Sequence, residues 1–428
     1  MELWDVITYL IKCFGFLLVT FATVFVVYVR KQHNKFAHIP GPPRDSIIFG
    51  NLPTVRKWRR EKGYFLAMMF NEWAKEYGNT FVLYFLFRAV VFTMDLNSVK
   101  EILMSGNHNK PDGTSRRIGF LFGERFVGTG LITETDEKKW ARRRLVLNQA
   151  FYRRFLRSIM EKFNEVGDEL MDKLEKVANG KTVIDLSKEL HYATLDVIGK
   201  MKFWKEKKLK KAVRNACCLL RKSGSQWLKD RQEAINQGEA VPDDILTLMI
   251  HAQDADPGIM SDDERLDDIV TFFLAGQETT ANLLTFTAYE LMQTPEVLTK
   301  MQQEIEAVQG SRTNIEFDDL TKLEYMGMLS SFVSGRNPDF NPDPQKFMPE
   351  RFHPDFEHRP PVYSYFPFSL GPRNCIGQNF AQIEGKVFLV KLLQKFDFKL
   401  AEGYEMKLTE KMTLQPIGGI PCTLTVRQ

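Results

Sequence analysis

The pattern of apolar and polar positions predicts a chain made mostly of helices. Residues 6–29 form an apolar run interrupted by a single charge, Lys12. In residues 137–155 and 163–177, apolar side chains recur every three to four positions, as on a helix with one buried face. The longest such stretch, residues 261–292, opens with Ser, Asp, Asp and Glu, the pattern of a capping box.

Strand patterns are fewer and shorter. Residues 80–94 are rich in Val, Phe and Leu and predict two strands joined near Arg88, followed by a short capped helix over residues 95–104. Residues 407–426 alternate weakly and indicate short strands, whereas the Pro- and Asp-rich residues 339–361 predict coil. The expected fold class is mainly α with a small β subdomain.

The apolar run near the N-terminus has the length of a membrane-spanning helix. Its residues would reach about 36 Å, enough to cross a hydrocarbon core of about 30 Å. Acidic residues precede the run and Arg30, Lys31 and Lys35 follow it, which predicts a cytosolic location for the bulk of the chain. A cleaved signal peptide would need a basic start and a small-residue cleavage site, and neither is present. A buried core helix is the alternative.

The chain divides after this run. Residues 40–43 read Pro-Gly-Pro-Pro, a stiff segment. We expect residues 1–5 to be a lumenal end, 6–29 a transmembrane helix, 30–43 a basic and Pro-rich hinge, and 44–428 the catalytic domain. No repeat or low-complexity tract subdivides the last part, and large single-domain enzymes reach this size.

Composition excludes some classes of function. The chain has 428 residues, of which 44% are hydrophobic and 26% charged, an ordinary globular balance. Its net charge of +4 is too small to indicate a nucleic-acid partner. Five cysteines without a spacing pattern indicate reduced thiols in a protein that faces the cytosol.

The most informative segment reads FPFSLGPRNCIG and ends at Gly377. It combines an aromatic residue, Phe368, with Gly371, Arg373 and Cys375. A thiolate that binds a metal must stay ionised, whereas a free thiol titrates near pKa 8.5. An apolar-periodic helix is predicted directly after the cysteine, and its positive end would lower the thiol pKa. A lone cysteine is more often a small buried hydrophobe, but four such partners within ten residues favour a metal ligand.

This segment resembles the haem-thiolate loop of the cytochrome P450 superfamily, and the resemblance extends over nearly the whole chain from Pro40. It implies the cytochrome P450 fold, internally truncated here, with haem b as cofactor and Cys375 as the iron ligand. Phe368, Gly371 and Gly377 would shape the loop against the macrocycle, and Arg373 would pair with a haem propionate.

The resemblance also implies an activity. A haem-thiolate monooxygenase inserts one oxygen atom of O2 into its substrate, with electrons from NADPH passed through a flavoprotein reductase. The segments LAGQETTAN and FPFSLGPRNCIGQNFAQ resemble the cholesterol 24-hydroxylase subfamily in particular. That implies a sterol or another lipophilic substrate, and a single-pass protein of the endoplasmic reticulum membrane with its catalytic domain in the cytosol.

A second motif lies inside the longest predicted helix. Glycine in a helix interior costs about 1 kcal/mol relative to alanine, so Gly276 needs a reason. The resemblance supplies one, because Ala275 and Gly276 would leave room for dioxygen beside the haem. Thr279 and Glu278 would then deliver protons during oxygen activation. The alternative is a threonine that bonds the carbonyl four residues back.

Two features of residues 137–147 add to the expected site. Trp140 and Arg144 lie four residues apart on one helix face, and the resemblance assigns the pair to the second haem propionate. Lys138, Lys139, Arg142 and Arg143 would make a basic patch for an acidic flavoprotein reductase. Each feature is also compatible with an ordinary solvated helix.

The chain departs from the family pattern at two places. No Glu in it is followed three residues later by Arg, so the Glu-x-x-Arg helix of the family is absent. The sequence instead jumps near Leu329 to a segment typical of a later region, which would leave Arg351 without its acidic partner. A second jump near residues 202–204 omits part of the region that would roof the substrate pocket.

Two other functions remain compatible with these observations. A haem-thiolate isomerase or dehydratase would need neither O2 nor a reductase, and the retention of Glu278 and Thr279 argues against it. An inactive truncated or splice product is the non-enzymatic alternative, and the two jumps favour it.

Overall fold

The computed structural model describes residues 3–63, 66–86, 88–105, 109–121, 123–198, 209–327, 343–344, 346–358, 360–361, 363–410 and 413–427. Its contacts divide the chain into two compact units, Met1–Ile102 and Leu103–Gln428. Each unit has a hydrophobic core of its own. The boundary at residue 43 between hinge and catalytic domain stays a prediction.

The first unit begins with α1 (Leu3–Lys35), one continuous helix that contains the predicted apolar run and extends beyond it. Its apolar side chains are mostly exposed. Among the described residues, it alone is long and apolar enough to cross a bilayer. Its C-terminal end is held by strand residues, because Tyr84 Oη donates to the His33 carbonyl oxygen and His33 Nε2 lies 3.1 Å from the Leu86 carbonyl oxygen.

The strands predicted after residue 80 are present. β1 (Thr80–Phe85) and β2 (Arg88–Thr93) pair antiparallel, with Thr80 opposite Thr93. Asp95 accepts a hydrogen bond from the Ser98 N–H at 2.8 Å and caps the next helix, as expected. The helices of this region are α2 (Leu52–Glu61), α3 (Leu66–Tyr77) and α4 (Leu96–Met104).

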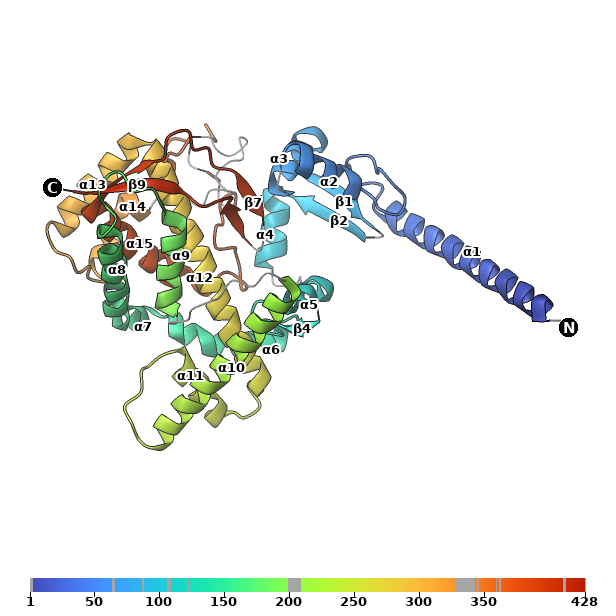
Figure 1. Ribbon diagram of the computed structural model, residues 1–428, viewed down its shortest axis with the longest axis horizontal. Coiled ribbons are helices and arrows are strands. Elements are labelled where there is room, and N and C mark those ends of the chain that lie inside the picture. Colours follow the sequence, from blue (N-terminus) through green and yellow to red (C-terminus); the bar gives the residue numbers. More distant parts are fainter. Residues whose placement is uncertain are drawn as a thin grey trace. The chain divides into compact units, whose positions relative to one another are not determined.

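The second unit is built around α12 (Asp262–Gln293). The predicted capping box is present, since the Ser261 hydroxyl accepts from the Glu264 N–H and the Glu264 carboxylate accepts from the Ser261 N–H. The other helices are α5 (Asp112–Gly119), α6 (Glu137–Leu147), α7 (Arg153–Ser158), α8 (Met160–Glu175), α9 (Leu186–Ile198), α10 (Leu209–Asn236), α11 (Ile245–Ala255), α13 (Pro295–Gln309), α14 (Glu324–Gly327) and α15 (Gln378–Lys395). α12 packs against α9, α10 and α15 (Figure 1).

Small sheets complete this unit. Its strands are β3 (Phe120–Leu121), β4 (Glu124–Arg125), β5 (Ile184–Asp185), β6 (Phe396–Leu400), β7 (Leu408–Glu410), β8 (Leu414–Pro416) and β9 (Pro421–Val426). β9 lies between β5 and β6, and β7 pairs with β8, so the strands predicted over residues 407–426 are present. β6 was not predicted, because it follows α15 directly with no turn residue between them. The mainly helical fold class is confirmed.

The single helix predicted over residues 137–155 is wrong. α6 ends at Leu147, and a 3₁₀ turn, Asn148–Phe151, separates it from α7. The Asn148 side chain accepts a hydrogen bond from Arg144 Nε at 2.8 Å, which satisfies it at the turn.

The main core of the second unit gathers side chains from α8, α9, α12, α13 and α15. It aligns the middle of α12 with α15, and the cysteine loop leads directly into α15. The two sequence departures, at residues 202–204 and 329–336, lie outside the described residues.

Candidate functional site

The cysteine loop is a tightly bonded turn. The Cys375 N–H donates to the Phe368 carbonyl oxygen at 2.8 Å, which closes the loop on itself. Gly371 has φ +71°, and a Cβ there would lie 1.9 Å from the Leu103 carbonyl oxygen. Only glycine fits this position, so the predicted need for Gly371 is supported by its backbone.

Gly377 does not share that requirement. It precedes α15 with φ −86°, and a Cβ there would meet Cys375 Sγ and Phe151 at 3.9 Å, an ordinary contact. The protein backbone at Gly377 therefore does not by itself require glycine. Its role beside a flat cofactor stays a prediction.

The ionisation of Cys375 differs from the expectation. The side chain keeps an exposed face, yet the surrounding protein removes enough hydration to raise the pKa of the thiol. The Gly377 N–H and the charge of Arg144 lower the pKa of the thiol, but the effect of burial is larger. The helix end alone therefore does not ionise the thiol, and a bound metal, which deprotonates a coordinating thiol, would have to do so.

Arg373 and Trp140 meet beside the loop. The Arg373 guanidinium carbon lies 4.3 Å from the centre of the Trp140 ring, a cation–π contact. Its Nη1 donates to the Glu134 carbonyl oxygen at 2.8 Å, while its Nη2 is buried without a hydrogen-bond partner among the described residues. Burial lowers the pKa of Arg373, so an acceptor for Nη2 would stabilise the charge.

Lys110 is a second cation at this place, and sequence reasoning missed it. Its Nζ donates to the Ile132 carbonyl oxygen at 2.8 Å. Burial, and then the charge of Arg373, lower the pKa of Lys110. No local sequence signal pointed to it, because its proximity to Arg373 arises from folding.

Arg144 contacts the loop itself. Its Nη1 donates to the Asn374 carbonyl oxygen at 2.8 Å and its Nη2 to Asn374 Oδ1 at 2.9 Å. Together with its bond to Asn148, this places the guanidinium beside Cys375. Contact between Arg144 and a propionate stays a prediction, and fixing the loop is a contribution that the sequence did not reveal.

The motif in α12 lies opposite the loop. Thr279 is exposed toward a cavity and donates to the Ala275 carbonyl oxygen at 2.6 Å, the bond of the structural alternative. Glu278 accepts hydrogen bonds from Thr413 Oγ1 at 2.5 Å and Gln415 Nε2 at 2.6 Å. Its carboxylate is therefore fixed by the β7–β8 region, which the sequence did not predict. Gly276, half-buried beside Ala275, continues the helix.

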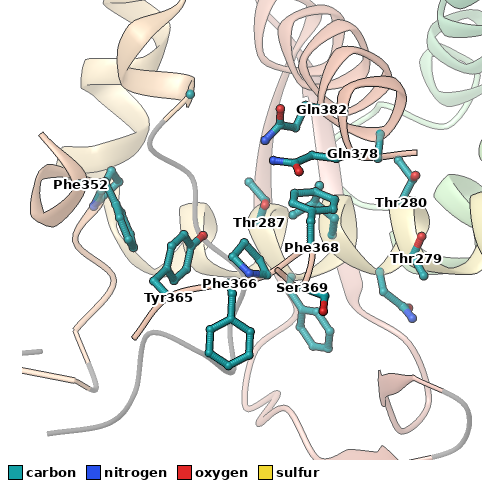
Figure 2. A pocket seen from close by; sticks show the side chains of 18 of the residues that line it. Thr279, Thr280, Thr287, Phe352, Tyr365, Phe366, Phe368, Ser369, Gln378 and Gln382 are labelled. Atoms are coloured by element: carbon teal, nitrogen blue, oxygen red, sulfur yellow. The ribbon is translucent and has the colours of Figure 1, made fainter. Parts of the chain in front are cut away.

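The cavity has a volume of about 800 Å³. Thr279 and Thr280 border it from α12, Phe368 from the loop, and Gln378 and Gln382 from α15, as Figure 2 shows. Residues on both sides of the sequence departure near Leu329 line it: Met326, Gly327, Pro344 and Lys346. The cavity therefore connects the motif in α12, the cysteine loop and the place where the chain departs from the family pattern.

The structure corrects the expectation for one arginine and shows the hydrogen bonds of another. Arg143 is 1% exposed and pairs with Asp268, so it cannot belong to a surface docking patch. Arg351, expected without its acidic partner, is buried and donates to the carbonyl oxygens of Asp343 and Lys346. These backbone hydrogen bonds could not be read from sequence spacing.

The gathered residues fit a haem group. Cys375 offers a soft thiolate, which suits iron. Arg373 and Lys110 donate to backbone carbonyls among the described residues, and two adjacent cations with spare donors suit carboxylates such as the haem propionates. The cavity lined by Thr279 and Phe368 offers open space next to them.

Comparison with known proteins identifies the family. The profile described as Cytochrome P450 matches residues 40–209, 201–329 and 328–422. The three pieces join at the two places where the sequence departs from the family pattern.

Individual relatives align over most of the chain. Cytochrome P450 4d2 of Drosophila melanogaster is 24% identical over 505 positions, covering 96% of this chain and 98% of that protein. Cytochrome P450 3A29 of Sus scrofa is 26% identical over 485 positions, covering 94% of each. Both alignments are longer than this chain, so the relatives carry segments that it lacks. The bifunctional cytochrome P450/NADPH–P450 reductase 2 of Bacillus subtilis is 27% identical over 76% of this chain and 38% of that protein. This chain therefore belongs to the cytochrome P450 family, in which haem iron is the cofactor.

Proposed function

We propose that this chain is a haem-thiolate monooxygenase that inserts one oxygen atom of O2 into a sterol-like lipid, as cholesterol 24-hydroxylases do. The observation that carries the proposal is the meeting of Arg373 and Lys110 beside the Cys375 loop, with Thr279 across the adjoining cavity. The cavity reaches the cysteine loop at Phe368, Gly371 and Asn374, so the Thr279 hydroxyl lies across it from the loop that carries Cys375 and Arg373.

The residues around the cysteine loop would have separate roles in holding the haem. Haem ligated by a thiolate supplies the chemistry of oxygen insertion into a C–H bond. Cys375 would provide the iron ligand, Arg373 Nη2 and Lys110 Nζ would hold propionates, and Arg144 keeps the loop in place through Asn374. Trp140 orients Arg373 by covering its guanidinium.

Proton delivery falls to the motif in α12. The Thr279 hydroxyl borders the cavity, and Glu278 is the adjacent carboxylate. Glu278 is held by Thr413 and Gln415, so it would leave one of these partners, take up a proton from solvent water and pass it to Thr279 Oγ1, whose own hydroxyl proton moves on into the cavity. Ala275 and Gly276, one turn earlier, keep the helix surface small at this point.

The substrate proposal rests on sequence resemblance and on the lining of the cavity. Phe286, Phe352, Tyr365 and Phe366 give that lining an aromatic character, which suits a lipophilic molecule. The relatives include a protein named cytokinin hydroxylase, so family membership alone does not select a sterol.

Electron supply and location belong to the same proposal. Two relatives carry names that join a P450 to an NADPH–P450 reductase, and we propose a separate flavoprotein reductase for this chain. α1 would anchor the protein as a single pass in the endoplasmic reticulum membrane, with residues 44–428 in the cytosol.

The test is a spectrum followed by a turnover assay. Full-length protein expressed with a haem precursor should, when reduced under carbon monoxide, show the strongly red-shifted Soret band of thiolate ligation, and Cys375→Ser should lose it. Cys218→Ser, at an exposed cysteine, is the control. Cholesterol should then be oxidised in the presence of NADPH and reductase. An unshifted band in haem-loaded protein would refute the ligand, and turnover of other lipids but not sterols would refute the substrate.

A non-catalytic product is the second candidate, and the three-piece family match favours it. It predicts folded protein that holds no haem even when haem is supplied in excess. Haem bound at a stoichiometry near one would exclude it.

A further inference from the structure

A buried carboxyl group lies where α15 packs against α12. Glu384 is fully buried, and neither of its carboxyl oxygens has a hydrogen-bond partner among the described residues. On α12, the buried Thr280 hydroxyl is likewise without a partner. Each unsatisfied polar group at this helix interface would lower the stability of the fold by about 1–3 kcal/mol. Two such groups at one interface therefore need an explanation.

The two groups are close enough to interact. The Thr280 hydroxyl acts to lower the pKa of Glu384, although the pair lies outside ordinary hydrogen-bond geometry. Burial has the larger effect and raises the pKa of Glu384 to about 8. At neutral pH the carboxyl therefore carries a proton, and a protonated carboxyl can donate as well as accept.

The nearby cations on α15 do not neutralise Glu384. Lys386 Nζ donates to the Leu320 and Leu323 carbonyl oxygens. Lys391 Nζ pairs with Asp168 at 2.6 Å. Among the described residues, the Thr280 hydroxyl is the side-chain hydrogen-bonding group that acts on the pKa of this carboxyl.

We propose that Glu384 is a positioning residue whose protonated carboxyl hydrogen-bonds the Thr280 hydroxyl and locks α15 to α12. The lock joins the two halves of the site. α15 starts at Gln378, three residues after Cys375, and Thr280 is the neighbour of Thr279. Thr280 also borders the cavity (Figure 2). Ala381 and Gly385 border it from α15. A shift between the helices would therefore move the thiolate loop relative to the proton-delivering hydroxyl. The spectroscopic part of this inference rests on the proposed function.

The experiment is a double-mutant cycle on the full-length chain in detergent. Glu384→Gln keeps the shape and a donor, Glu384→Leu removes both polar atoms, and Thr280→Val removes the hydroxyl. Thr285→Val is the matched control, because Thr285 is also a buried α12 threonine whose hydroxyl has no hydrogen-bond partner in the described part of the chain. Denaturant unfolding followed by circular dichroism gives the unfolding equilibrium constant of each variant.

We expect E384L and T280V to be coupled by about threefold or more in that constant, the range for residues in contact. E384L and T285V should combine independently, and E384Q should stay near the unmutated protein. Independence of E384L and T280V, or equal damage from E384Q and E384L, would overturn the lock. If E384L does not fold, Glu384→Ala, which also removes both polar atoms, replaces it in the same cycle with T280V.

The haem-loaded protein supplies a second readout. With the lock broken in E384L, a smaller fraction of the reduced carbon monoxide complex should show the thiolate band, while E384Q should keep it. An unchanged fraction in E384L would overturn the link to the site. Absence of the band in the unmutated protein would instead count against the proposed function, and the unfolding cycle would still judge the lock.

Discussion

Arg143 and Asp268 form an ion pair almost wholly excluded from water. Arg143 Nη2 donates to Asp268 Oδ2 at 2.6 Å, and their side chains are 1% and 0% exposed. The pair joins α6, which carries Trp140 and Arg144, to α12. Burial raises the pKa of Asp268 to about 6 in spite of the arginine.

Removing one member of this pair should be costly. Arg143→Met leaves a buried carboxylate without its cation, and we expect a loss of about 3–5 kcal/mol in the free energy of unfolding. Arg142 lies on the same helix as Arg143 but forms an exposed ion pair, with Asp256. Arg142→Met breaks that pair and should lower the free energy of unfolding by about 0–1 kcal/mol. Denaturant unfolding of both variants measures the contrast, and similar losses would contradict the distinction.

The basic patch on α6 should consist of Lys138, Lys139 and Arg142 without Arg143. If it binds the reductase, reversing these three charges should slow first-electron transfer, mainly at low ionic strength. At physiological salt, charges are screened over about 8 Å. Stopped-flow reduction at several salt concentrations tests this, with Lys222→Glu on α10 as the control. A rate that depends on neither the mutations nor salt would leave α6 a solvated helix.

Thr279→Ala should separate oxygen consumption from product formation. Without the hydroxyl at the cavity, protons are no longer delivered to a defined position. NADPH oxidation therefore continues while hydrogen peroxide formation rises and product formation falls by about 10²-fold or more. Thr299→Ala removes the same kind of bond to the carbonyl four residues back, on α13, and should change nothing. Unchanged coupling in Thr279→Ala would make its bond to Ala275 purely structural.

Glu384 should make stability depend on pH. The unfolded carboxyl titrates near 4.5 and the folded one near 8, so between these values the folded state holds one more proton. For this group, stability falls by about 1.4 kcal/mol per pH unit as pH rises from 5 to 8 and is constant above 8. E384Q lacks this dependence, so its unfolding free energy should rise relative to the unmutated protein across that interval. Unfolding curves at pH 5 to 9 measure the difference in unfolding free energy between E384Q and the unmutated protein. A difference that does not change with pH would show that Glu384 ionises near its ordinary pKa.

Restoring the segment that relatives carry at the 328–329 junction should increase haem retention. The cavity is lined on both sides of that junction, and a helix placing four or five apolar side chains there adds on the order of 10 kcal/mol at about 1.5–3 each. Total stability is about 5–15 kcal/mol, so the effect should be visible. The haem-to-protein ratio of the extended chain, against one with a scrambled segment of equal length, measures it. A 428-residue chain that is already fully haem-loaded and unfolds cooperatively would contradict the prediction.

Local sequence determined the features that depend on near neighbours in the chain. The capping box at Ser261 and Glu264, the β1–β2 pair and the long apolar helix α1 each follow from residues within one turn or one strand. The cysteine loop belongs to the same class, because the bond from Cys375 to Phe368 spans seven residues.

Tertiary structure decided what depends on residues far apart in the chain. Arg143 has the sequence context of a surface cation, and only Asp268, 125 residues away, makes it a buried ion pair. Lys110 approaches Arg373, Arg144 bonds Asn374, and burial reverses the expected shift of the Cys375 pKa. Burial and charge pairing arise when surfaces pack together, so the spacing of residues along the chain does not predict them. The periodicity of a helix predicts which face is apolar, but it does not predict which element covers that face.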